Sequence, residues 1–358
     1  IKNPKDIQEL IKKFNIQTII LAIPSLSNKR KKEIFLSLNK YQVDILQVPK
    51  LSEINIEIGN INRLKPIKIN DILGREVAKP NFQLMSQVIK NSVICVTGAG
   101  GSIGSEICKQ IAVYNPKKLI LIDQSEYNLF KIEEYFNSIF KNQVEFSTYL
   151  GRAQHYQFIK KIFLQEKVEI VFHASAYKHV HLVEDNPLEG LSNNINSSNI
   201  ICRCAYESNI KKTILISSDK AVRPTNIMGV SKRISELIFQ SYDKKDKENK
   251  SLKNRTIFTI VRFGNVLDSS GSVVPKFREQ IANGGPLTLT NKRVIRYFMT
   301  LEEAAQLVIQ SSSLAKGGET FLLDMGKPVK IYDLAKQMIL LSGNNVKDPK
   351  NKYSGGIE

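Results

Sequence analysis

The sequence predicts an α/β protein whose main part is a doubly wound parallel sheet. Two observations lead to this fold class. From Val93 onward, short apolar runs alternate with amphipathic stretches of helical length, which is typical of parallel strands joined by helices. Residues 4–48 show the same alternation on a smaller scale. With 358 residues, of which 42% are apolar, the chain is long enough for about two domains of roughly 150 residues each.

Residues 1–80 are expected to form part of a small α/β domain and the linker that follows it. The predicted elements, in order, are a helix in "PKDIQELIKKF", a strand in "TIILAI", a helix in "KRKKEIFLSLNKY" and a strand in "VDILQV". This order predicts the back half of a parallel α/β domain. A polar connector containing "DILGREVAKPN" then leads to a new start near residue 90.

Residues 90–260 are expected to form the main domain. Val93 to Thr97 is predicted to be a short buried strand, followed by a glycine-containing turn and a helix marked by Ile103, Ile107 and Ile111. Further strands are predicted in "KLILID", "VEIVFHAS" and "KTILISSD", and a further helix in "GVSKRISELIFQSY". Strands that alternate with helices of this length predict a parallel sheet covered on both faces.

The first strand of this domain is followed by glycines spaced G-x-x-G-x-x-G at Gly98, Gly101 and Gly104. Such glycines let the backbone approach a pyrophosphate, whose charge then lies at the N-terminus of the following helix. Asp123 ends the next strand, 19 positions after Gly104, where a carboxylate can accept hydrogen bonds from the adenosine ribose. That carboxylate would repel a 2′-phosphate, so the pattern predicts NAD rather than NADP. A helix-capping role for the aspartate of "DQSE" is a compatible alternative.

The formal charge of the chain is +18, from 52 Lys and Arg against 34 Asp and Glu. Such a charge could serve a nucleic acid, an anionic membrane surface or a phosphorylated substrate. The basic residues are mixed with acids, as in "DKKDKENKSLKNR" at 243–255, which we expect to be a solvated surface loop. The cluster at 29–32 is expected to be a solvated helix start. No nucleic-acid-binding motif accompanies it, so no nucleic-acid partner is predicted.

Metal binding and membrane spanning find little support in the sequence. The four cysteines form no C-x-x-C pair, and His179 and His181 alternate across an expected extended segment, so no metal site is predicted. No apolar run approaches about 18 residues. The chain begins "IKNPK" without a methionine, so we expect a fragment from which membrane anchors could be missing. Reduced core cysteines and the absence of a signal peptide predict a cytoplasmic protein.

Five long stretches carry a resemblance to a known family: "VTGAGGSIGSE", "VFHASAYKHVHLVEDNP", "SSDKAVRPTNIMGVSKR", "VRFGNVLDSSGSVVPKFREQIANGGPLTLT" and "RYFMTLEEAAQLV". The chain resembles the extended short-chain dehydrogenase/reductase superfamily, from about Val93 to about Leu341. Within it, the chain is similar to the nucleotide-sugar 4,6-dehydratases of bacterial polysaccharide and glycan biosynthesis. Longer members carry N-terminal membrane helices and a first nucleotide-binding-like domain, and residues 1–80 resemble the end of that domain.

This resemblance implies a Rossmann-type sheet at 90–260 and a smaller substrate domain at 261–358, truncated at its end. It implies a lyase that uses NAD to dehydrate UDP-N-acetylglucosamine with retained C5 configuration, in a pathway such as that of bacillosamine and protein glycosylation. It also implies a homodimer or higher homo-oligomer, anchored at the cytoplasmic face of the bacterial inner membrane. A C5-inverting dehydratase, a UDP-sugar 4-epimerase and a regulator that only binds NAD and nucleotide sugar are the alternatives.

The catalytic residues implied by the resemblance follow the strand "TILIS". Asp219 would protonate the leaving C6 hydroxyl, Lys220 would take the C5 proton, and Asp219 or Ser218 would relay the C4 hydroxyl proton. A structural Asp–Lys ion pair is the alternative. Met228 stands where the superfamily has its proton-transferring tyrosine, and a thioether cannot transfer a proton. A subgroup of the C5-retaining dehydratases has methionine at this position.

The binding residues implied by the resemblance fall into two sets. Lys232 would hold the nicotinamide ribose, one helical turn after Met228, and the other cofactor residues would be Gly98, Gly101, Ser102, Ile103, Gly104, Asp123 and Ala174. The nucleotide sugar would meet Lys178, Arg262, Asn265, Ser270, Gly271, Ser272 and Arg296. A guanidinium matches phosphate oxygens bidentately, although either arginine could be an ordinary ion-pair residue. The segment "YLGRAQH" offers Arg152 and no acid to the adenine.

Overall fold

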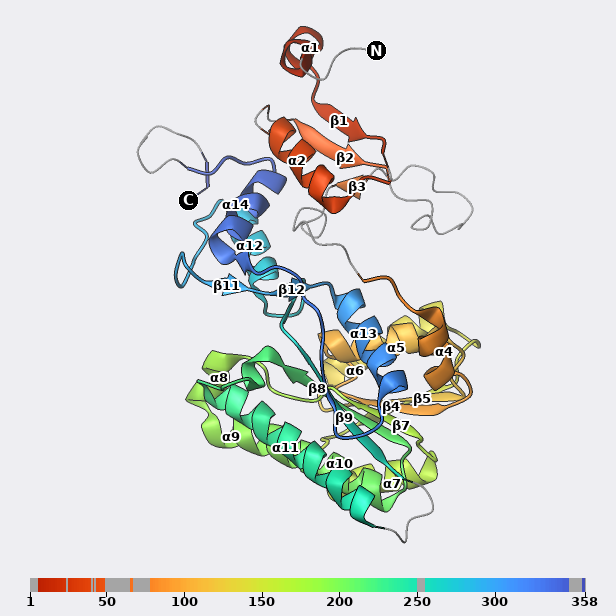
Figure 1. Cartoon of the computed structure of the whole chain (residues 1–358). Helices are drawn as coiled ribbons and strands as arrows, with labels where there is room; N and C mark the ends of the chain where they lie inside the picture. The colour runs from red at the N-terminus through yellow and green to blue at the C-terminus, as the bar shows by residue number, and fades with distance from the viewer. Residues whose placement is uncertain are drawn as a thin grey trace. The chain divides into compact units, whose positions relative to one another are not determined.

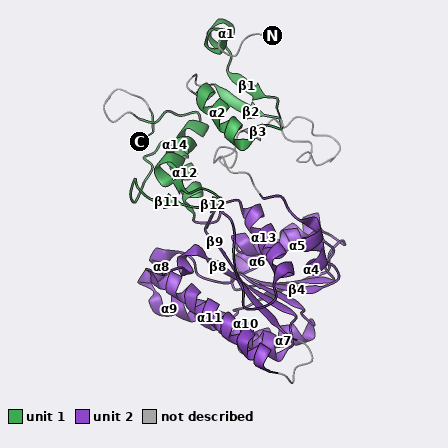
Figure 2. Cartoon of the chain, viewed as in Figure 1, with its two compact units in different colours: residues 1–77, 272–298, 326–358 green, residues 78–271, 299–325 purple. Residues whose placement is uncertain are grey.

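The computed structural model describes residues 6–23, 25–39, 41, 43–48, 65–66, 78–249, 255–347 and 356–357. The chain divides into two compact units (Figure 2). Unit 1 comprises residues 1–77, 272–298 and 326–358, and unit 2 comprises residues 78–271 and 299–325. Both units are discontinuous in sequence, whereas the three segments expected from the sequence follow chain order and stay a prediction.

Unit 2 is built on a seven-stranded sheet with the strand order β13-β9-β8-β7-β4-β5-β6. All neighbouring strands are parallel, which confirms the predicted fold class. The order reverses between β4 and β7, as in a doubly wound sheet. The strands are β4 (Val93–Thr97), β5 (Lys118–Asp123), β6 (Phe146–Leu150), β7 (Ile170–His173), β8 (Lys212–Ser218), β9 (Ile257–Phe263) and β13 (Thr320–Leu322).

Helices cover both faces of this sheet (Figure 1). One face packs against α4 (Phe82–Ile89), α5 (Ser102–Ala112), α6 (Glu126–Ile139) and α13 (Leu301–Leu314). The other packs against α7 (Tyr156–Gln165), α10 (Ser197–Glu207) and α11 (Ile227–Glu248). Strand β4 serves both cores, because Ile94 and Val96 face one while Val93 and Cys95 face the other. This two-sided burial explains why the strands are continuous apolar runs.

The remaining elements of unit 2 are short. They are α8 (Val180–Asp185), α9 (Pro187–Leu191), the π-helical turn η3 (Ser192–Asn196), the 3₁₀ turn η4 (Asp219–Ala221) and β10 (Asn265–Val266). Since α8 begins at Val180, the extended conformation expected for His181 is wrong. Strand β12 (Phe298–Met299) lies where the two units meet in sequence.

The loop expected over residues 243–255 is also wrong in its first half, because α11 continues to Glu248. Asp243 is 2% exposed and holds Lys247 and Arg255 through its two carboxylate oxygens. In this charged run the buried carboxylate of Asp243 therefore forms ion pairs with two more exposed cations, which hold the end of α11. Residues 250–254 lie outside the described part of the chain.

Unit 1 contains α1 (Ile7–Phe14), β1 (Thr18–Leu21), α2 (Asn28–Asn39), β2 (Asp44–Gln47) and β3 (Lys65–Pro66). β1 and β2 are parallel, in the helix–strand order that the sequence predicts, and β3 is antiparallel to β2. Residues 71–77 of the expected connector lie outside the described residues. The unit also contains α12 (Val273–Ala282), β11 (Ile295–Arg296), β14 (Val329–Lys330) and α14 (Ile331–Leu341), with β11 antiparallel to β14. Among the described residues, no helix combines the length and apolar character needed to cross a bilayer.

Candidate active site

The glycine-containing turn between β4 and α5 lies at the carboxyl edge of the sheet in unit 2. Gly98 has φ +69°, and a Cβ there would stand 2.8 Å from the backbone nitrogen of Ser175. A Cβ on Gly104 would stand 2.0 Å from the Gly98 carbonyl oxygen, so this glycine lets α5 approach the turn. At Gly101 the nearest atom to a Cβ is 3.3 Å away. Two of the three glycines are therefore required by packing.

The third glycine, Gly101, is the N-cap residue of α5, and Ser102 and Ile103 are the first residues of that helix. The first N–H groups of a helix have no partner within it, and they carry the positive end of the helix dipole. This turn therefore has the donors that a pyrophosphate requires.

Asp123 closes the next strand and is held against the same turn. Its Oδ2 accepts a hydrogen bond from the backbone N–H of Gly100 (2.9 Å), and its Oδ1 accepts one from the N–H of Ser125 (2.8 Å). The helix that follows is capped by Ser125, which accepts from the N–H of Asn128, so the helix-capping role considered for Asp123 is wrong. The carboxylate is 7% exposed and fixed at the carboxyl end of β5.

Ser218, Asp219 and Lys220 form a hydrogen-bonded cluster at the end of β8. Asp219 Oδ1 accepts from Ser218 Oγ (2.9 Å) and from Lys220 Nζ (3.1 Å). Lys220 Nζ also donates to Asn265 Oδ1 (3.4 Å). The side chains of Asp219 and Lys220 are each 30% exposed, so a ligand can reach both. The structure thus brings three of the five side chains predicted as catalytic together with one predicted substrate residue, Asn265.

Met228 and Lys232 lie one turn apart on the same face of helix α11. Met228 is 2% exposed, and Lys232 is 8% exposed and donates from Nζ to the carbonyl oxygen of Ile216 (2.9 Å). Burial lowers the pKa of Lys232 to about 8, and the negative charge of Glu236 acts in the opposite direction. The helix starts close to the turn η4, which follows β8, because a Cβ on Gly229 would stand 2.4 Å from the carbonyl oxygen of Lys220. A lone glycine in "MGVSK" was the sequence signal for this approach.

The segment after β10 is joined to the glycine-containing turn. The N–H of Ser270 donates to Ser102 Oγ (3.1 Å), so one predicted substrate residue contacts one predicted cofactor residue. Gly271 has φ +67°, and a Cβ there would stand 2.4 Å from Cε1 of His179. The loop after β7, which contains His179, therefore packs against this segment.

Two further predicted site residues belong to this loop or to the strand end before it. The N–H of Ala174 donates to the Thr97 carbonyl oxygen (3.0 Å), which continues the pairing of β7 with β4 beyond the strands. Lys178 has an exposed side chain four positions later.

Arg262 engages a residue that sequence reasoning missed. Its Nε and one terminal nitrogen donate to the two carboxylate oxygens of Glu236, at 2.6 and 2.5 Å, and Glu236 is fully buried. This ion pair corresponds to the structural alternative left open for Arg262. Glu236 is separated from Arg262 by 26 positions, and the helical pattern of its segment gave no sign of the pair.

Asn194 is a second residue that the sequence did not reveal. It is 1% exposed within the turn η3, where its Oδ1 accepts from the N–H of Tyr177 (2.8 Å). Its side-chain amide donates to the Tyr177 carbonyl oxygen (3.1 Å) and to Ser231 Oγ (2.8 Å). Asn194 therefore ties the loop after β7 to α11.

The other two predicted substrate residues lie in unit 1. Ser272 is the N-cap residue of α12, and Arg296, on β11, is exposed and donates to the carbonyl oxygen of Ile295 (2.9 Å). Their contact with a substrate stays a prediction. Among the described residues, no group of three or more His, Cys, Asp or Glu side chains could hold a metal ion.

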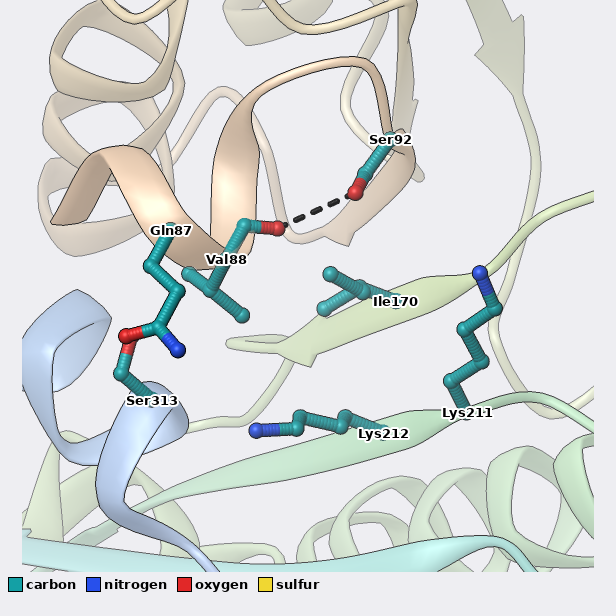
Figure 3. A pocket seen from close by; sticks show the side chains of 7 residues that line it. All are labelled: Gln87, Val88, Ser92, Ile170, Lys211, Lys212 and Ser313. Carbon is teal, nitrogen blue, oxygen red and sulfur yellow. Dashed lines mark hydrogen bonds between the residues drawn. The ribbon is translucent and has the colours of Figure 1, made fainter. Parts of the chain in front are cut away.

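A separate cavity of about 250 Å³ lies at the amino ends of β4, β7 and β8, the edge opposite the cluster (Figure 3). In it, Lys212 Nζ donates to the carbonyl oxygen of Ser312 (2.6 Å) in the last turn of α13, and Lys211 pairs with Glu169. Both lysines thus have structural partners. The cavity is lined by Gln87, Val88, Ser92, Ile170, Lys211, Lys212 and Ser313.

Comparison with known proteins extends the argument beyond this geometry. The model of a family described as polysaccharide biosynthesis protein matches residues 94–356. The chain belongs to this polysaccharide biosynthesis protein family. It is 43% identical over 351 residues to the capsular polysaccharide biosynthesis protein CapD of Staphylococcus aureus, covering 98% of this chain and 57% of CapD. The chain therefore spans just over half the length of that relative.

The family relationship reaches nucleotide-sugar enzymes. A UDP-N-acetylglucosamine 4,6-dehydratase (inverting) of Campylobacter jejuni is 32% identical over 244 residues, which cover 68% of this chain and 69% of that enzyme. The fold matches that of Bordetella bronchiseptica WbmF in complex with NAD+ and UDP, with a TM-score of 0.60 and 20% identity over 73% of this chain and 80% of WbmF. The predicted relationship to nucleotide-sugar dehydratases and epimerases is confirmed, while the C5-retaining, membrane-anchored subtype stays a prediction.

Proposed function

We propose that this family member is an NAD-dependent UDP-N-acetylglucosamine 4,6-dehydratase that retains the configuration at C5. The observation that carries the proposal is the cluster in which Asp219 Oδ1 accepts hydrogen bonds from both Ser218 and Lys220. An acid and a base side by side at the carboxyl end of a parallel strand suit an elimination, which must remove one proton and supply another. A 4-epimerase needs no such pair.

The residues of the glycine-containing turn fit NAD. Gly101, Ser102 and Ile103 would receive the pyrophosphate at the start of α5, and Asp123 would accept the adenosine ribose hydroxyls. Gly98 and Gly104 let the backbone elements approach closely around this place, and Gly98 packs against the backbone of Ala174. NAD, when bound, takes up a hydride from C4 of the hexose and later returns it to C6.

Lys220 and Asp219 account for the protons of the elimination. In the elimination, Lys220 would act as a neutral amine, and Asp219, whose Oδ1 lies 3.1 Å from Lys220 Nζ, as a carboxylic acid that has received the C4 hydroxyl proton. Lys220 then takes the C5 proton, the C–O bond at C6 breaks, and Asp219 protonates the departing hydroxyl to give water. The pair is left in its ionic form. When the hydride returns to C6, Lys220 gives a proton back to C5, which leaves a neutral amine and a carboxylate ready for the next turnover.

The oxidation at C4 requires a different proton acceptor, because Met228 cannot accept a proton. Ser218 Oγ, which is hydrogen-bonded to Asp219, can pass the C4 hydroxyl proton to the carboxylate of Asp219. Lys232 would hold the nicotinamide ribose. Substrate contacts are proposed for Lys178, Asn265, Ser270 and Gly271, and those expected for Ser272 and Arg296 stay a prediction. Arg262 supports Glu236 within the protein.

The wider setting of the enzyme is proposed on the same resemblance. The UDP-4-keto-6-deoxy product would enter the synthesis of a deoxyamino sugar such as bacillosamine, for a polysaccharide or a glycoprotein. The whole protein would act as a homodimer or larger oligomer at the cytoplasmic face of the inner membrane.

The test is proton NMR of UDP-N-acetylglucosamine incubated with the protein and NAD in deuterated water. The proposal requires a 4-keto-6-deoxy product that carries deuterium at C5 with unchanged C5 configuration. A product inverted at C5 would instead indicate the inverting reaction for which the Campylobacter jejuni relative is named. A C4 epimer of the substrate would indicate an epimerase. Unchanged substrate in the presence of bound NAD, with UDP-glucose also unchanged, would favour a nucleotide-sugar-binding regulator.

A further inference from the structure

One face of helix α11 carries three residues spaced four positions apart, Met228, Lys232 and Glu236. Residues at this spacing lie above one another on a helix. All three are buried, at 2%, 8% and 0% exposure. The first two were already considered for the site, whereas Glu236 has no part in the chemistry proposed above.

Glu236 joins two neighbouring strands of the sheet to this helix. Its Oε1 accepts hydrogen bonds from Ser217 Oγ (2.7 Å) and from Nε of Arg262 (2.6 Å). Its Oε2 accepts from the other end of the Arg262 guanidinium and from Arg233 (3.0 Å). Ser217 on β8 and Arg262 on β9 are direct partners in the sheet register, so their side chains emerge on the same face. One carboxylate therefore clamps a cross-strand pair.

Both ends of this clamp are close in sequence to the proposed chemistry. Ser217 immediately precedes Ser218, and Arg262 lies three positions before Asn265. Asn265 and Lys220 meet across the ends of β9 and β8 at 3.4 Å. A relative shift of these two strand ends would change that distance first.

We propose that Glu236 is a positioning residue, which fixes the ends of β8 and β9 through Ser217 and Arg262 and whose charge supports the ammonium group of Lys232. The part that concerns turnover rests on the proposed dehydratase function. Desolvation offsets much of the attraction within a buried charged pair, so such a pair is weak evidence of a gain in stability. Its place beside the strand ends gives this pair a positioning role instead.

The groups that act on Lys232 are few. Glu236, on its own helix, raises the pKa of Lys232 against the effect of burial. His173, on β7, is close enough for the charge of Lys232 to act on it, and burial lowers the pKa of this histidine to about 3, so it is neutral near pH 7. From β8, Lys232 meets the carbonyl oxygen of Ile216. Loss of the Glu236 charge therefore leaves Lys232 without its acidic neighbour, and its proton dissociates at lower pH.

The test compares Glu236→Gln with Glu166→Gln. Glu166 also pairs with a lysine and accepts from a tyrosine hydroxyl, but at the amino edge of the sheet, through Lys118 and Tyr149. For Glu236→Gln we expect kcat to fall by roughly 10- to 100-fold because misplaced reacting groups react slowly. KM for UDP-N-acetylglucosamine should change by less than about threefold, since no substrate contact is removed. Glu166→Gln should keep both constants.

The charge is tested separately by NADH affinity against pH, measured by fluorescence titration. If Lys232 holds the ribose as an ammonium, affinity falls as pH rises through its pKa, and the midpoint should move down by about one pH unit in Glu236→Gln. Arg262→Gln should lower kcat as well but leave that midpoint where it is or higher, because Glu236 keeps its charge. An unchanged midpoint in Glu236→Gln would overturn the role of the charge.

Turnover of Glu236→Gln within threefold of wild type would overturn the positioning role. If this variant does not fold, Arg262→Gln and Arg262→Lys decide, because the lysine can still hold one oxygen of Glu236 and should recover part of the lost kcat. Equal turnover in these two variants and wild type would contradict the proposal. If the wild-type protein leaves UDP-N-acetylglucosamine unchanged, the dehydratase assignment fails, and the NADH midpoint still decides on Glu236.

Discussion

Replacing Lys232 by methionine should make unit 2 more stable near neutral pH while it removes the activity. Lys232 is 8% exposed, and burial lowers its pKa from 10.5 to about 8. Each pKa unit corresponds to about 1.36 kcal/mol, so holding this ammonium in the folded state costs about 3 kcal/mol at pH 7. The variant also loses a hydrogen bond to the carbonyl oxygen of Ile216, worth about 1 kcal/mol. The net expectation is a gain of about 2 kcal/mol for Lys232→Met.

The lowered pKa of Lys232 also sets the sign with which the free energy of unfolding depends on pH. Because the pKa of Lys232 is lower in the folded state, the unfolded chain binds more protons between about pH 8 and 10.5. The stability of the wild type therefore rises with pH across this window. As pH falls, stability decreases, and the full cost of the buried ammonium is present below about pH 8. The advantage of Lys232→Met should be largest at pH 7 and nearly gone by about pH 9.5.

The assay is urea unfolding followed by circular dichroism at several pH values. The transition of unit 2 is the one that NADH shifts in the wild type, because a ligand stabilises the unit that binds it. Lys131→Met, an exposed lysine on α6, is the control and should change stability by less than about 0.5 kcal/mol at every pH. A Lys232→Met protein less stable than wild type at pH 7, or a difference that does not shrink with pH, would refute the reasoning.

The proposed chemistry gives three further expectations. Lys220→Ala should lose both product and deuterium exchange at C5, whereas Asp219→Asn should lose product by roughly 100-fold or more but keep some exchange, as followed by NMR. Met228→Leu should keep kcat and change stability by less than about 1.5 kcal/mol, because the buried thioether serves as packing; a large loss of kcat would contradict this. Gly104→Ala should abolish NADH binding in a fluorescence titration, since its Cβ would stand 2.0 Å from the Gly98 carbonyl oxygen, while Ala112→Gly in the same helix should keep it.

The strands and most helices of unit 2 could be predicted because their signals are local. Strand β4 is a continuous apolar run, and Ile107 and Ile111 mark one face of α5. The end of α11 could not be predicted in this way. Asp243 is followed in sequence by two lysines, and its burial goes with contacts to Lys247, Arg255 and the following strand. The strand order likewise depends on contacts between distant segments.

The residues of the candidate site also differ in whether the sequence could predict them. Ser218, Asp219 and Lys220 are adjacent in sequence and meet through short side chains, so the motif alone placed them together. Glu236 and Asn194 act through partners on other elements. Their residue types are ordinary for a helix, and a single sequence holds no signal for a contact between distant elements.

The structure also bears on why a methionine can stand at the tyrosine position. Lys232 and Glu236 still engage β8, at Ile216 and Ser217, one helical turn apart. In this helix Lys232 and Glu236 hold charge and fix the strand, while Met228 serves only for packing. The hydroxyl, carboxylate and amine proposed for proton transfer lie together at Ser218, Asp219 and Lys220, on the strand end that α11 holds. In such an arrangement the three proton transfers depend on one backbone segment, so a substitution that moves the end of β8 should impair them together, whereas a substitution at Met228 should impair none.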